Sequence, residues 1–382
     1  MMACVDSAEL QKKAEKFLPR LFRDYVAGGA HEERTLQANR DEFRKWTIKP
    51  RCLRDVSSVS TTTQWLGYDC SAPFMLAPVG FAGMMRQGGD LMAARAAAKE
   101  KIPFCVSTFS IASLEEICRV PGADVLAQIY VFRDRDITRD MMERARKCGV
   151  RTLIFTVDTP VTPLRPRDER NGFRRLSKPS LAQLASFAAA WRWGAGMARH
   201  GMPQLRNLSA YGMGHSLLEQ AKNAASQIDP GLTWRDLEWF RAQWSGQLLV
   251  KGIMHADDAS RCVAAGADAV IVSNHGGRQL DPAPATLAVL PEIVQSAGQD
   301  CSVVIDSGIR RGGDVVTSLA QGASLTASGR PWAWAVAAGG ESGVREMISL
   351  LRREIYDVFA LSGHNSVESL RLAGVDVLKR QK

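Results

Sequence analysis

The sequence predicts an α/β protein whose parallel strands close into a barrel, and three observations predict it. Eight short apolar runs alternate with helical stretches. Most runs are apolar nearly throughout, as strands covered on both faces should be. The Gly-x-Gly-x-x-Gly turn of a doubly wound sheet is missing, so a TIM (β/α)8 barrel is favoured over that open alternative. The expected strands are 74–78, 103–107, 125–130, 152–157, 247–251, 269–273, 302–306 and 324–328.

The composition restricts the class of protein. The 382 residues are 46% hydrophobic and 23% charged, and 49 Lys and Arg against 40 Asp and Glu give a net charge of +9. This balance is that of an ordinary globular chain and excludes collagen-like and disordered classes. Because such barrels commonly exceed 250 residues as one unit, we expect a single domain over 1–382. It comprises an N-terminal cap over 1–70, the barrel over 71–345 and C-terminal helices over 346–382.

No signal for export or for membrane spanning is visible. Asp6 and Glu9 stand where a secretory signal would be apolar, and no apolar run reaches the length of about 18 residues that spanning needs. The eight cysteines lack the spacing of a zinc or redox pair, which suits a reducing compartment. We therefore expect a cytoplasmic protein without a metal. Nucleic acid is not an expected partner, because no basic run is interleaved with aromatic residues.

The expected helices follow in chain order. Asp6 and Glu9 form a capping box and Gly28 follows the last helical residue, so one helix is expected over 6–27. An irregular stretch rich in Thr and Ser then extends to about residue 70. Amphipathic helices are expected after most strands, over 88–101, 113–119, 138–148, 256–265, 284–297 and 313–321.

One interval interrupts the repeat. Residues 158–246 separate the fourth and fifth strands, which is far longer than a usual connection, so we expect an insertion over 170–230. Its middle, 181–201, is too short and too charged to span a membrane. Two alternatives stay open: a segment in the interface of a bilayer, which would place the protein peripherally on the inner face of the cell membrane, or a lid over the barrel or against another subunit. The segment combines Phe187, Trp191 and Trp193 with Arg192, Arg199 and His200.

Polar side chains stand at the carboxyl end of nearly every expected strand. Chemistry gathers at this end of a parallel barrel. Capping or burial explains one or two such groups but not a ring of them, so we interpret the ring as functional. Its members are Ser107, Thr108, Gln128, Tyr130, Thr156, Asp158, Lys251 and the runs 273–281, 306–314 and 328–331.

Residues after the last two strands predict a phosphate site. Gly308 and Gly329 expose backbone N–H groups just ahead of helices, with Arg310 and Arg330 beside them. Sugar phosphates and flavin mononucleotide (FMN) both fit. No Walker or dinucleotide fingerprint is present, which argues against ATP and NAD.

The loop after the sixth strand predicts chemistry on a carboxylate substrate. His275 can act as a base near neutral pH, and the fork of Arg278 can hold a carboxylate by two hydrogen bonds. Asp158 can orient the imidazole and stabilise its charged form, as in a catalytic triad. The three residues fit a substrate with a carboxylate and an ionisable C–H or O–H.

These residues lie in motifs that resemble the FMN-dependent α-hydroxy acid dehydrogenases and oxidases. The run SNHGGRQLD at 273–281 is very similar to the signature of that family. The resemblance covers nearly the whole chain and is strongest to membrane-associated bacterial L-lactate and (S)-mandelate dehydrogenases, with RHGMPQLRNLSAY at 199–211 and WRDLEWFRAQW at 234–244. The other motifs are DYVAGGA (24–30), LAPVGFAGM (76–84), QIY (128–130), TVDTP (156–160), VKGI (250–253) and DSGIRRGGD (306–314).

The resemblance implies a role for each site residue. His275 would be the catalytic base with Asp158 as its partner. Lys251 would face the N1 side of the flavin, where a positive charge stabilises the reduced ring. Arg278, Arg165, Tyr25 and Tyr130 would bind the substrate. FMN would be held by Ser107, Gln128, Thr156 and Ser273 at its ring, by Asp306 at the ribityl chain and by Gly308, Arg310, Gly329 and Arg330 at the phosphate.

The activity that the resemblance implies is oxidation of an L-2-hydroxy acid to the 2-oxo acid, in a homotetramer that passes electrons to a quinone or another carrier. One rival is an oxidase that gives its electrons to oxygen, although Gly80 matches the dehydrogenase-like members. Others are a flavin- or phosphate-binding barrel isomerase and a membrane-surface protein that keeps the barrel as a scaffold. Phe81 and Phe109 fit either an aryl or a short aliphatic substrate.

Overall fold

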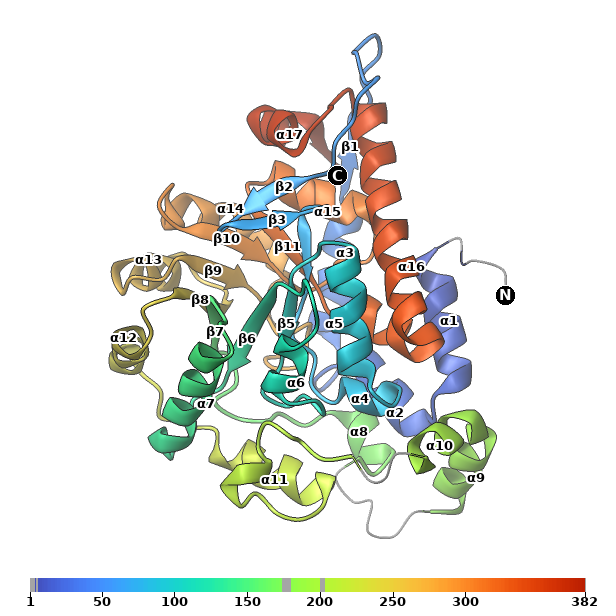
Figure 1. Ribbon diagram of the computed structural model, residues 1–382. Coiled ribbons are helices and arrows are strands. Elements are labelled where there is room, and N and C mark those ends of the chain that lie inside the picture. Colours follow the sequence, from blue (N-terminus) through green and yellow to red (C-terminus); the bar gives the residue numbers. More distant parts are fainter. Residues whose placement is uncertain (1–3, 5, 174–179, 200–202, 382) are drawn as a thin grey trace.

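Eight parallel strands form a closed barrel in the computed structural model, which describes residues 4, 6–173, 180–199 and 203–381 (Figure 1). Neighbouring strands pair in the cyclic order β10-β11-β4-β5-β6-β7-β8-β9. The predicted TIM barrel is thus confirmed, and the open doubly wound sheet is excluded. The strands are β4 (Phe74–Leu76), β5 (Phe104–Val106), β6 (Val125–Ile129), β7 (Thr152–Thr156), β8 (Gln247–Ile253), β9 (Ala269–Val272), β10 (Ser302–Ile305) and β11 (Leu325–Ser328).

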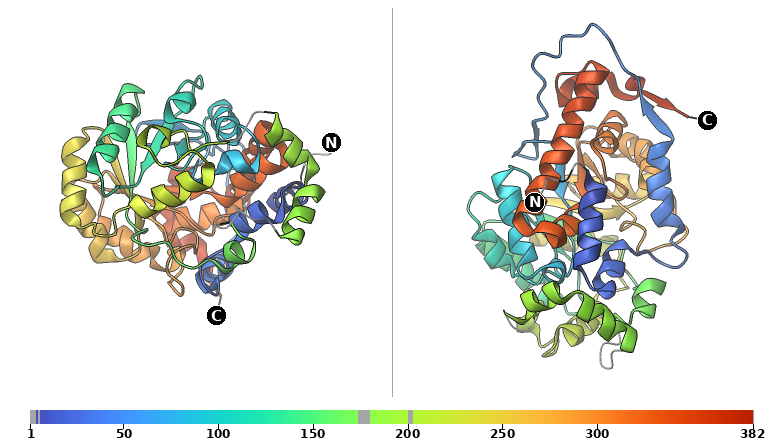
Figure 2. Two further views of the ribbon diagram at one scale, coloured as in Figure 1. Left: turned by 90° about the horizontal axis from the view of Figure 1, so that it is seen from below. Right: turned by 90° about the vertical axis from the view of Figure 1, so that its right-hand side faces the viewer.

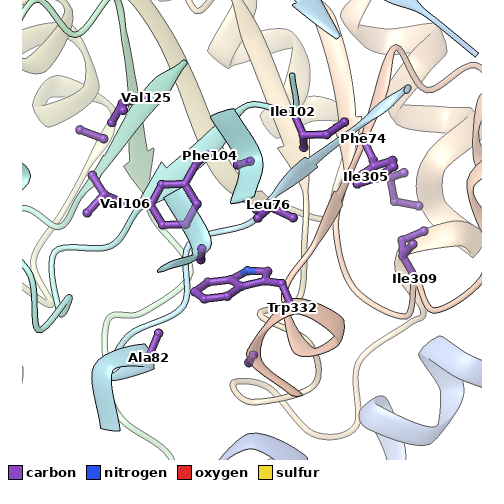
Figure 3. Close-up of a cluster of buried hydrophobic side chains, with 14 of the residues drawn as sticks. Phe74, Leu76, Ala82, Ile102, Phe104, Val106, Val125, Ile305, Ile309 and Trp332 are labelled. Atoms are coloured by element: carbon purple, nitrogen blue, oxygen red, sulfur yellow. The ribbon is translucent and has the colours of Figure 1, made fainter. Parts of the chain in front are cut away.

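The barrel strands are buried on both faces, which explains their nearly continuous apolar runs. Met75, Leu126 and Ile154 belong to a cluster inside the barrel. Side chains on the outer face pack against the surrounding helices; Phe104 meets Trp332 with ring centroids 5.8 Å apart (Figure 3). This double burial fixes the strand ends, from which the polar ring projects.

Helices surround the barrel, and all six that the sequence predicted are present within a few residues. The largest difference is α7, which starts three residues earlier than expected because Asp134 caps it, accepting a hydrogen bond from the N–H of Asp136. The surrounding helices are α4 (Ala82–Met85), α5 (Gly89–Lys99), α6 (Leu114–Cys118), α7 (Arg135–Lys147), α12 (Trp234–Gln243), α13 (Ala256–Ala264), α14 (Thr286–Ala297), α15 (Gly312–Ala320) and α16 (Arg330–Ser362).

The N-terminal segment corrects two expectations. The single helix expected over 6–27 is two helices, because Pro19 cannot donate to the helix and forces Leu18 into an extended conformation. The stretch up to residue 70 is also less irregular than expected, since it holds a helix, one strand that pairs with the C-terminal end of the chain and two strands that pair with each other. The elements are α1 (Ser7–Phe17), α2 (Arg20–Ala27), α3 (Arg34–Arg44), β1 (Trp46–Ile48), β2 (Thr63–Trp65) and β3 (Tyr68–Cys70).

The C-terminal segment returns to the N-terminal cap. After α17 (Val367–Ala373) and the short helix η2 (Gly374–Val377), the strand β12 (Leu378–Arg380) pairs antiparallel with β1. The expected C-terminal helices therefore end in a strand. The loop 49–62 arches over the far end of α16 (Figure 2, right).

The insertion is helical and gathers at the lower end of the molecule in Figure 1. Of the segment 181–201, residues 200 and 201 lie outside the described part, as do 174–179. Within the described residues no helix is both long and apolar enough to cross a membrane. The elements are α8 (Pro166–Arg170), α9 (Leu181–Ala189), α10 (Trp191–Ala198), the short helix η1 (Ser209–Tyr211) and α11 (Leu217–Gln227).

Candidate active site

A cavity of about 890 Å³ lies at the carboxyl ends of the barrel strands, between the strand ends, α2 and α11. Its size is that of a site for a cofactor and a small substrate. Of the residues to which the resemblance assigns a role, all but two line this cavity. The exceptions, Asp158 and Ser273, stand directly behind His275 and Lys251.

His275 and Asp158 form the predicted pair. Nδ1 of His275 lies 3.0 Å from each carboxylate oxygen of Asp158. Because an ionised carboxylate only accepts hydrogen bonds, Nδ1 carries the proton and Nε2 keeps its lone pair. Gly252 makes room for this pair, since a Cβ there would lie 2.5 Å from Cβ of Asp158. The sequence did not indicate that role for Gly252.

The surroundings of this pair shift both pKa values downwards. Burial lowers the pKa of His275, and the opposing effect of Asp158 does not restore its ordinary value. Burial alone would raise the pKa of Asp158, but the charges of His275 and Lys251 and the hydrogen bond with His275 outweigh it and lower that pKa. At neutral pH the pair is therefore a neutral imidazole on an ionised carboxylate, which is the state a base needs.

Arg278 presents a donor that protein atoms leave unused. Its Nη1 donates to the carbonyl oxygens of Tyr25, at 2.7 Å, and Gly28, at 2.8 Å. Its Nη2 is buried and has no hydrogen-bond partner among the described residues. Such a group is costly to bury, and a carboxylate in the cavity would satisfy it. Arg165 lines the same cavity, with Nε 3.3 Å from the carbonyl oxygen of Arg278, so the two predicted carboxylate ligands are brought together.

Aromatic rings form one wall of the cavity. Tyr25 stacks on Phe173 with centroids 4.7 Å apart, and Phe81 stands edge-on to both. Phe109 continues the wall between Phe81, at 6.0 Å, and Tyr130, at 5.5 Å. Burial raises the pKa of both tyrosines, so their hydroxyl groups stay protonated and can donate. Phe173 lies after α8 in the insertion, outside every motif, and the sequence did not indicate it.

A buried polar cluster lies at the ends of β8, β9 and β10. Nζ of Lys251 donates to Oγ of Ser273 at 2.8 Å and lies 3.4 Å from Oδ2 of Asp306. Ser273 in turn donates to the same Asp306 oxygen at 2.7 Å. The cluster thus keeps the Lys251 ammonium at the strand ends with only part of its hydrogen-bonding capacity used.

Gln128 joins three neighbouring strand ends. Its Nε2 donates to Oγ1 of Thr156 at 3.0 Å, and its Oε1 accepts from the N–H of Thr108 at 3.2 Å and from Oγ of Ser107 at 3.3 Å. These contacts place polar atoms of β5, β6 and β7 in one row along the cavity.

The predicted phosphate site lies at the start of α16. Gly329 precedes the helix, whose first N–H groups have no carbonyl partner within it and favour an anion. A Cβ at Gly329 would meet no atom closer than 3.6 Å, so the protein itself does not need glycine there. Burial and the nearby Arg40 lower the pKa of Arg310 to about 10, which leaves it a cation at neutral pH.

Arg330 has contacts that the sequence did not predict. Its guanidinium donates to the carbonyl oxygens of Val26, at 2.8 Å, Gly28, at 2.8 Å, and Gly276, at 2.9 Å. The side chain therefore links α2 to the loop that carries His275. Its contact with a phosphate stays a prediction.

Comparison with known proteins identifies the family of this site. A family model described as FMN-dependent dehydrogenase matches residues 14–376. The chain belongs to the FMN-dependent dehydrogenase family. It is 39% identical over 373 residues to an L-lactate dehydrogenase of Pseudomonas syringae pv. syringae (strain B728a), with 97% of both chains covered. An L-lactate dehydrogenase of Caulobacter sp. (strain K31) is 38% identical over 375 residues, again with 97% of both chains covered.

Solved structures extend the comparison. The crystal structure of the monotopic membrane protein (S)-mandelate dehydrogenase superimposes with a TM-score of 0.95 at 39% identity, covering 100% of both chains. A mandelate oxidase with (S)-4-hydroxymandelic acid gives a TM-score of 0.85 at 36% identity, covering 99% of both chains. The resemblance predicted from the motifs is thus confirmed, and the chain is an FMN-dependent oxidoreductase.

The residues of the cavity fit FMN. The cavity is lined by polar side chains from three neighbouring strand ends, by the buried Lys251 and by a helix start with an adjacent arginine. These groups suit the polar ring, the polyol chain and the phosphate of FMN.

Proposed function

We propose that the protein oxidises an L-2-hydroxy acid to the corresponding 2-oxo acid. The single observation that carries this proposal is Nη2 of Arg278, which has no hydrogen-bond partner in the described part of the chain and lies in the cavity that His275, paired with Asp158, also lines. FMN, when bound, accepts the two electrons that leave the substrate. The sugar-phosphate isomerase alternative gives Arg278 no carboxylate, and the scaffold alternative gives the catalytic pair no task.

The chain's own residues would divide the remaining work. Arg278 and Arg165 hold the substrate carboxylate, which places the hydroxyl carbon near His275. Nε2 of His275 takes one of the two protons that the substrate loses, the other leaving with the two electrons, and the Asp158 carboxylate stabilises the resulting imidazolium. The hydroxyl groups of Tyr25 and Tyr130 donate to substrate oxygens.

A second set of residues would hold the cofactor. Lys251 places its positive charge where negative charge develops on the reduced ring. The remaining assignments are those that the resemblance implies: Ser107, Gln128, Thr156 and Ser273 at the ring, Asp306 at the ribityl chain, and Gly308, Arg310, Gly329 and Arg330 at the phosphate.

The aromatic wall supports an aryl substrate of the (S)-mandelate type. The rings of Tyr25, Phe81, Phe109 and Phe173 form a continuous surface with centroid separations of 4.7 to 6.0 Å. An aromatic substituent gains both apolar burial and ring–ring contacts there, whereas a methyl group fills little of that surface. L-Lactate is the second candidate, because the two relatives given above are L-lactate dehydrogenases.

Substitution of Phe173 tests this preference. Phe173→Ala should lower kcat/KM for (S)-mandelate by about tenfold and change that for L-lactate by less than about threefold, because only the aryl ring contacts the lost side chain. Steady-state rates with both acids and an artificial dye give the ratio. Equal losses for the two acids would contradict the assignment of an aryl substrate.

The outer part of the insertion, residues 180–199, supports contact with a membrane and a quinone as the electron acceptor. Leu181 and Trp191 are 86% and 65% exposed, and Leu184 lies on the same helical pair at 49%. The guanidinium carbon of Arg192 stands 5.3 Å from the ring of Trp191, so a cation accompanies the apolar side chains. Such a surface suits an interface with anionic lipid. Trp193, by contrast, is buried and donates to the carbonyl oxygen of Met84 at 2.8 Å.

The proposal includes the homotetramer implied by the resemblance. The upper end of α16 and α17 lie opposite the insertion (Figure 1). Leu361 on α16, Leu372 on α17 and Val375 in η2 are exposed apolar side chains and support a contact between subunits there. The oxidase alternative for electron transfer predicts hydrogen peroxide in air at a rate comparable to that of dye reduction, and the dehydrogenase does not.

A further inference from the structure

The inner part of the insertion, residues 203–230, is joined to the active site through one buried side chain. Asn207 is 3% exposed and lies just before η1. Its Nδ2 donates to the carbonyl oxygen of Ser107 at 3.1 Å, and its Oδ1 accepts from the N–H of Leu114 at 2.7 Å. Ser107 directly follows β5 and Leu114 begins α6, so a single amide connects both ends of the loop 107–114.

That loop carries groups of both halves of the site. Ser107 and Thr108 hold Gln128 in the row of polar atoms along the cavity. Phe109 belongs to the aromatic wall, and its carbonyl oxygen accepts from the N–H of Phe81 at 2.9 Å. A displacement of this loop would therefore move the cofactor contacts and the substrate wall together.

Asn207 is itself held in place by Arg144. Nη1 of Arg144, on α7, donates to its carbonyl oxygen at 2.8 Å. The same arginine forms two hydrogen bonds with Glu115, at 2.6 and 3.0 Å, and one with the hydroxyl of Tyr211 at 3.0 Å. The hydrogen bonds from Arg144 lower the pKa of Glu115 to about 2, so the ion pair persists at every pH at which the protein would be assayed. The network connects the insertion to α6 and α7.

The rest of the inner insertion is equally well anchored. Oε1 of Gln220, on α11, accepts from the N–H of Leu205 at 2.8 Å, two residues before Asn207. At the other end of α11, Ile228 forms a bridge with Phe132, and the N–H of Arg133 donates to Gln227 at 2.7 Å. Because α11 also lines the cavity, this part of the insertion forms a fixed wall of the site.

We propose that Asn207 is a positioning residue, whose hydrogen bond to Ser107 sets the place of the 107–114 loop and so couples the insertion to the binding of FMN and of substrate. For substrate, this rests on the function proposed above. Loss of the bond would remove one of two donors to the buried carbonyl oxygen of Ser107, the other being the N–H of Ser110 at 3.0 Å, and would free that end of the loop from the insertion. The insertion thus contributes to catalysis through Asn207 without touching the reacting atoms.

The decisive variant is Asn207→Asp. It keeps an oxygen for the N–H of Leu114 and for Arg144 but removes the N–H that binds Ser107. Asn223→Asp is a control for the same amide-to-acid change at an exposed position, because Nδ2 of Asn223 donates at 2.9 Å to the carbonyl oxygen of Met213, inside the insertion and away from the loop. Both variants are compared with wild type in the FMN-loaded form, and FMN is removed and titrated back to obtain its dissociation constant.

We expect Asn207→Asp to weaken FMN binding by roughly fivefold or more, to shift the visible spectrum of the bound flavin and to lower kcat/KM by about tenfold, as expected for one buried hydrogen bond. Asn223→Asp should stay within about twofold of wild type in each. Should Asn207→Asp not fold, Asn207→Ser and Asn223→Ser replace the pair with the same expectations. The proposal would be overturned if the Asn207 variant had the FMN dissociation constant and spectrum of the wild type, or if the Asn207 and Asn223 variants changed equally. Failure of the wild type to oxidise hydroxy acids would refute the proposed function and leave the FMN comparison valid.

Discussion

The ring of strand ends buries polar side chains, whereas the outer insertion, residues 180–199, exposes apolar ones. Each departs from the usual placement of side chains, and in opposite directions. In the ring, Gln128 and Lys251 are each 3% exposed although both are polar. In the outer insertion, Leu181 and Trp191 are mostly exposed although both are apolar. Buried polar groups and exposed apolar groups are the informative exceptions to ordinary burial. FMN and its substrate explain the first departure, and the proposed contact with a membrane would explain the second.

The inner insertion shows that this contrast does not follow chain order. Leu205 and Leu208 are fully buried, and Asn207 between them bonds to the barrel. No residue of α9 is buried, although it belongs to the same connection between two strands. The insertion therefore has two parts, one built into the active site and one left on the surface. Substitutions in the two parts should separate chemistry from membrane contact.

The largest effect is expected inside the ring, at His275. His275→Ala should retain FMN but reduce the rate of flavin reduction by substrate about 10²- to 10⁴-fold, the usual contribution of a general base. Anaerobic stopped-flow absorbance measures this rate. Rapid flavin reduction by the variant would show that His275 is not the catalytic base and that the ring only binds cofactor and substrate.

The same residue gives the pH dependence. A base acts when it is unprotonated, and burial lowers the pKa of His275 below its ordinary value of 6.5. The rate of flavin reduction at low substrate should therefore fall to half its maximum only below pH 6.5. A half-maximal rate above pH 6.5 would contradict the predicted direction.

The smallest effect on catalysis is expected outside, at α9 and α10. Leu184→Ser combined with Trp191→Ser should leave dye-linked activity unchanged and weaken sedimentation with phosphatidylglycerol vesicles by about tenfold, because two apolar side chains no longer enter the interface. Leu53→Ser is the control, since this side chain is 104% exposed in the loop 49–62, at the end of the molecule opposite the insertion (Figure 2, right). Equal vesicle binding by wild type and both variants would contradict membrane contact through this surface.

The sequence predicted the barrel and the polar ring well because both depend on local patterns. Strands buried on two faces are apolar throughout, and their carboxyl ends meet by topology. The break at Pro19 was also visible in the sequence, but the flanking capping signals favoured one helix. Phe173 and Asn207 could not be predicted, since each acts through contacts with residues far away in the chain. The opposite exposure of Trp191 and Trp193, two residues apart, likewise depends on which one meets the barrel.

The central claim is that this cavity oxidises a 2-hydroxy acid with bound FMN. The most direct test is the visible spectrum of the FMN-loaded protein during anaerobic titration with (S)-mandelate and then L-lactate. The flavin absorbance should bleach with both acids and faster with (S)-mandelate. A flavin that stays oxidised with each acid, in protein whose FMN is fully bound, would contradict this claim.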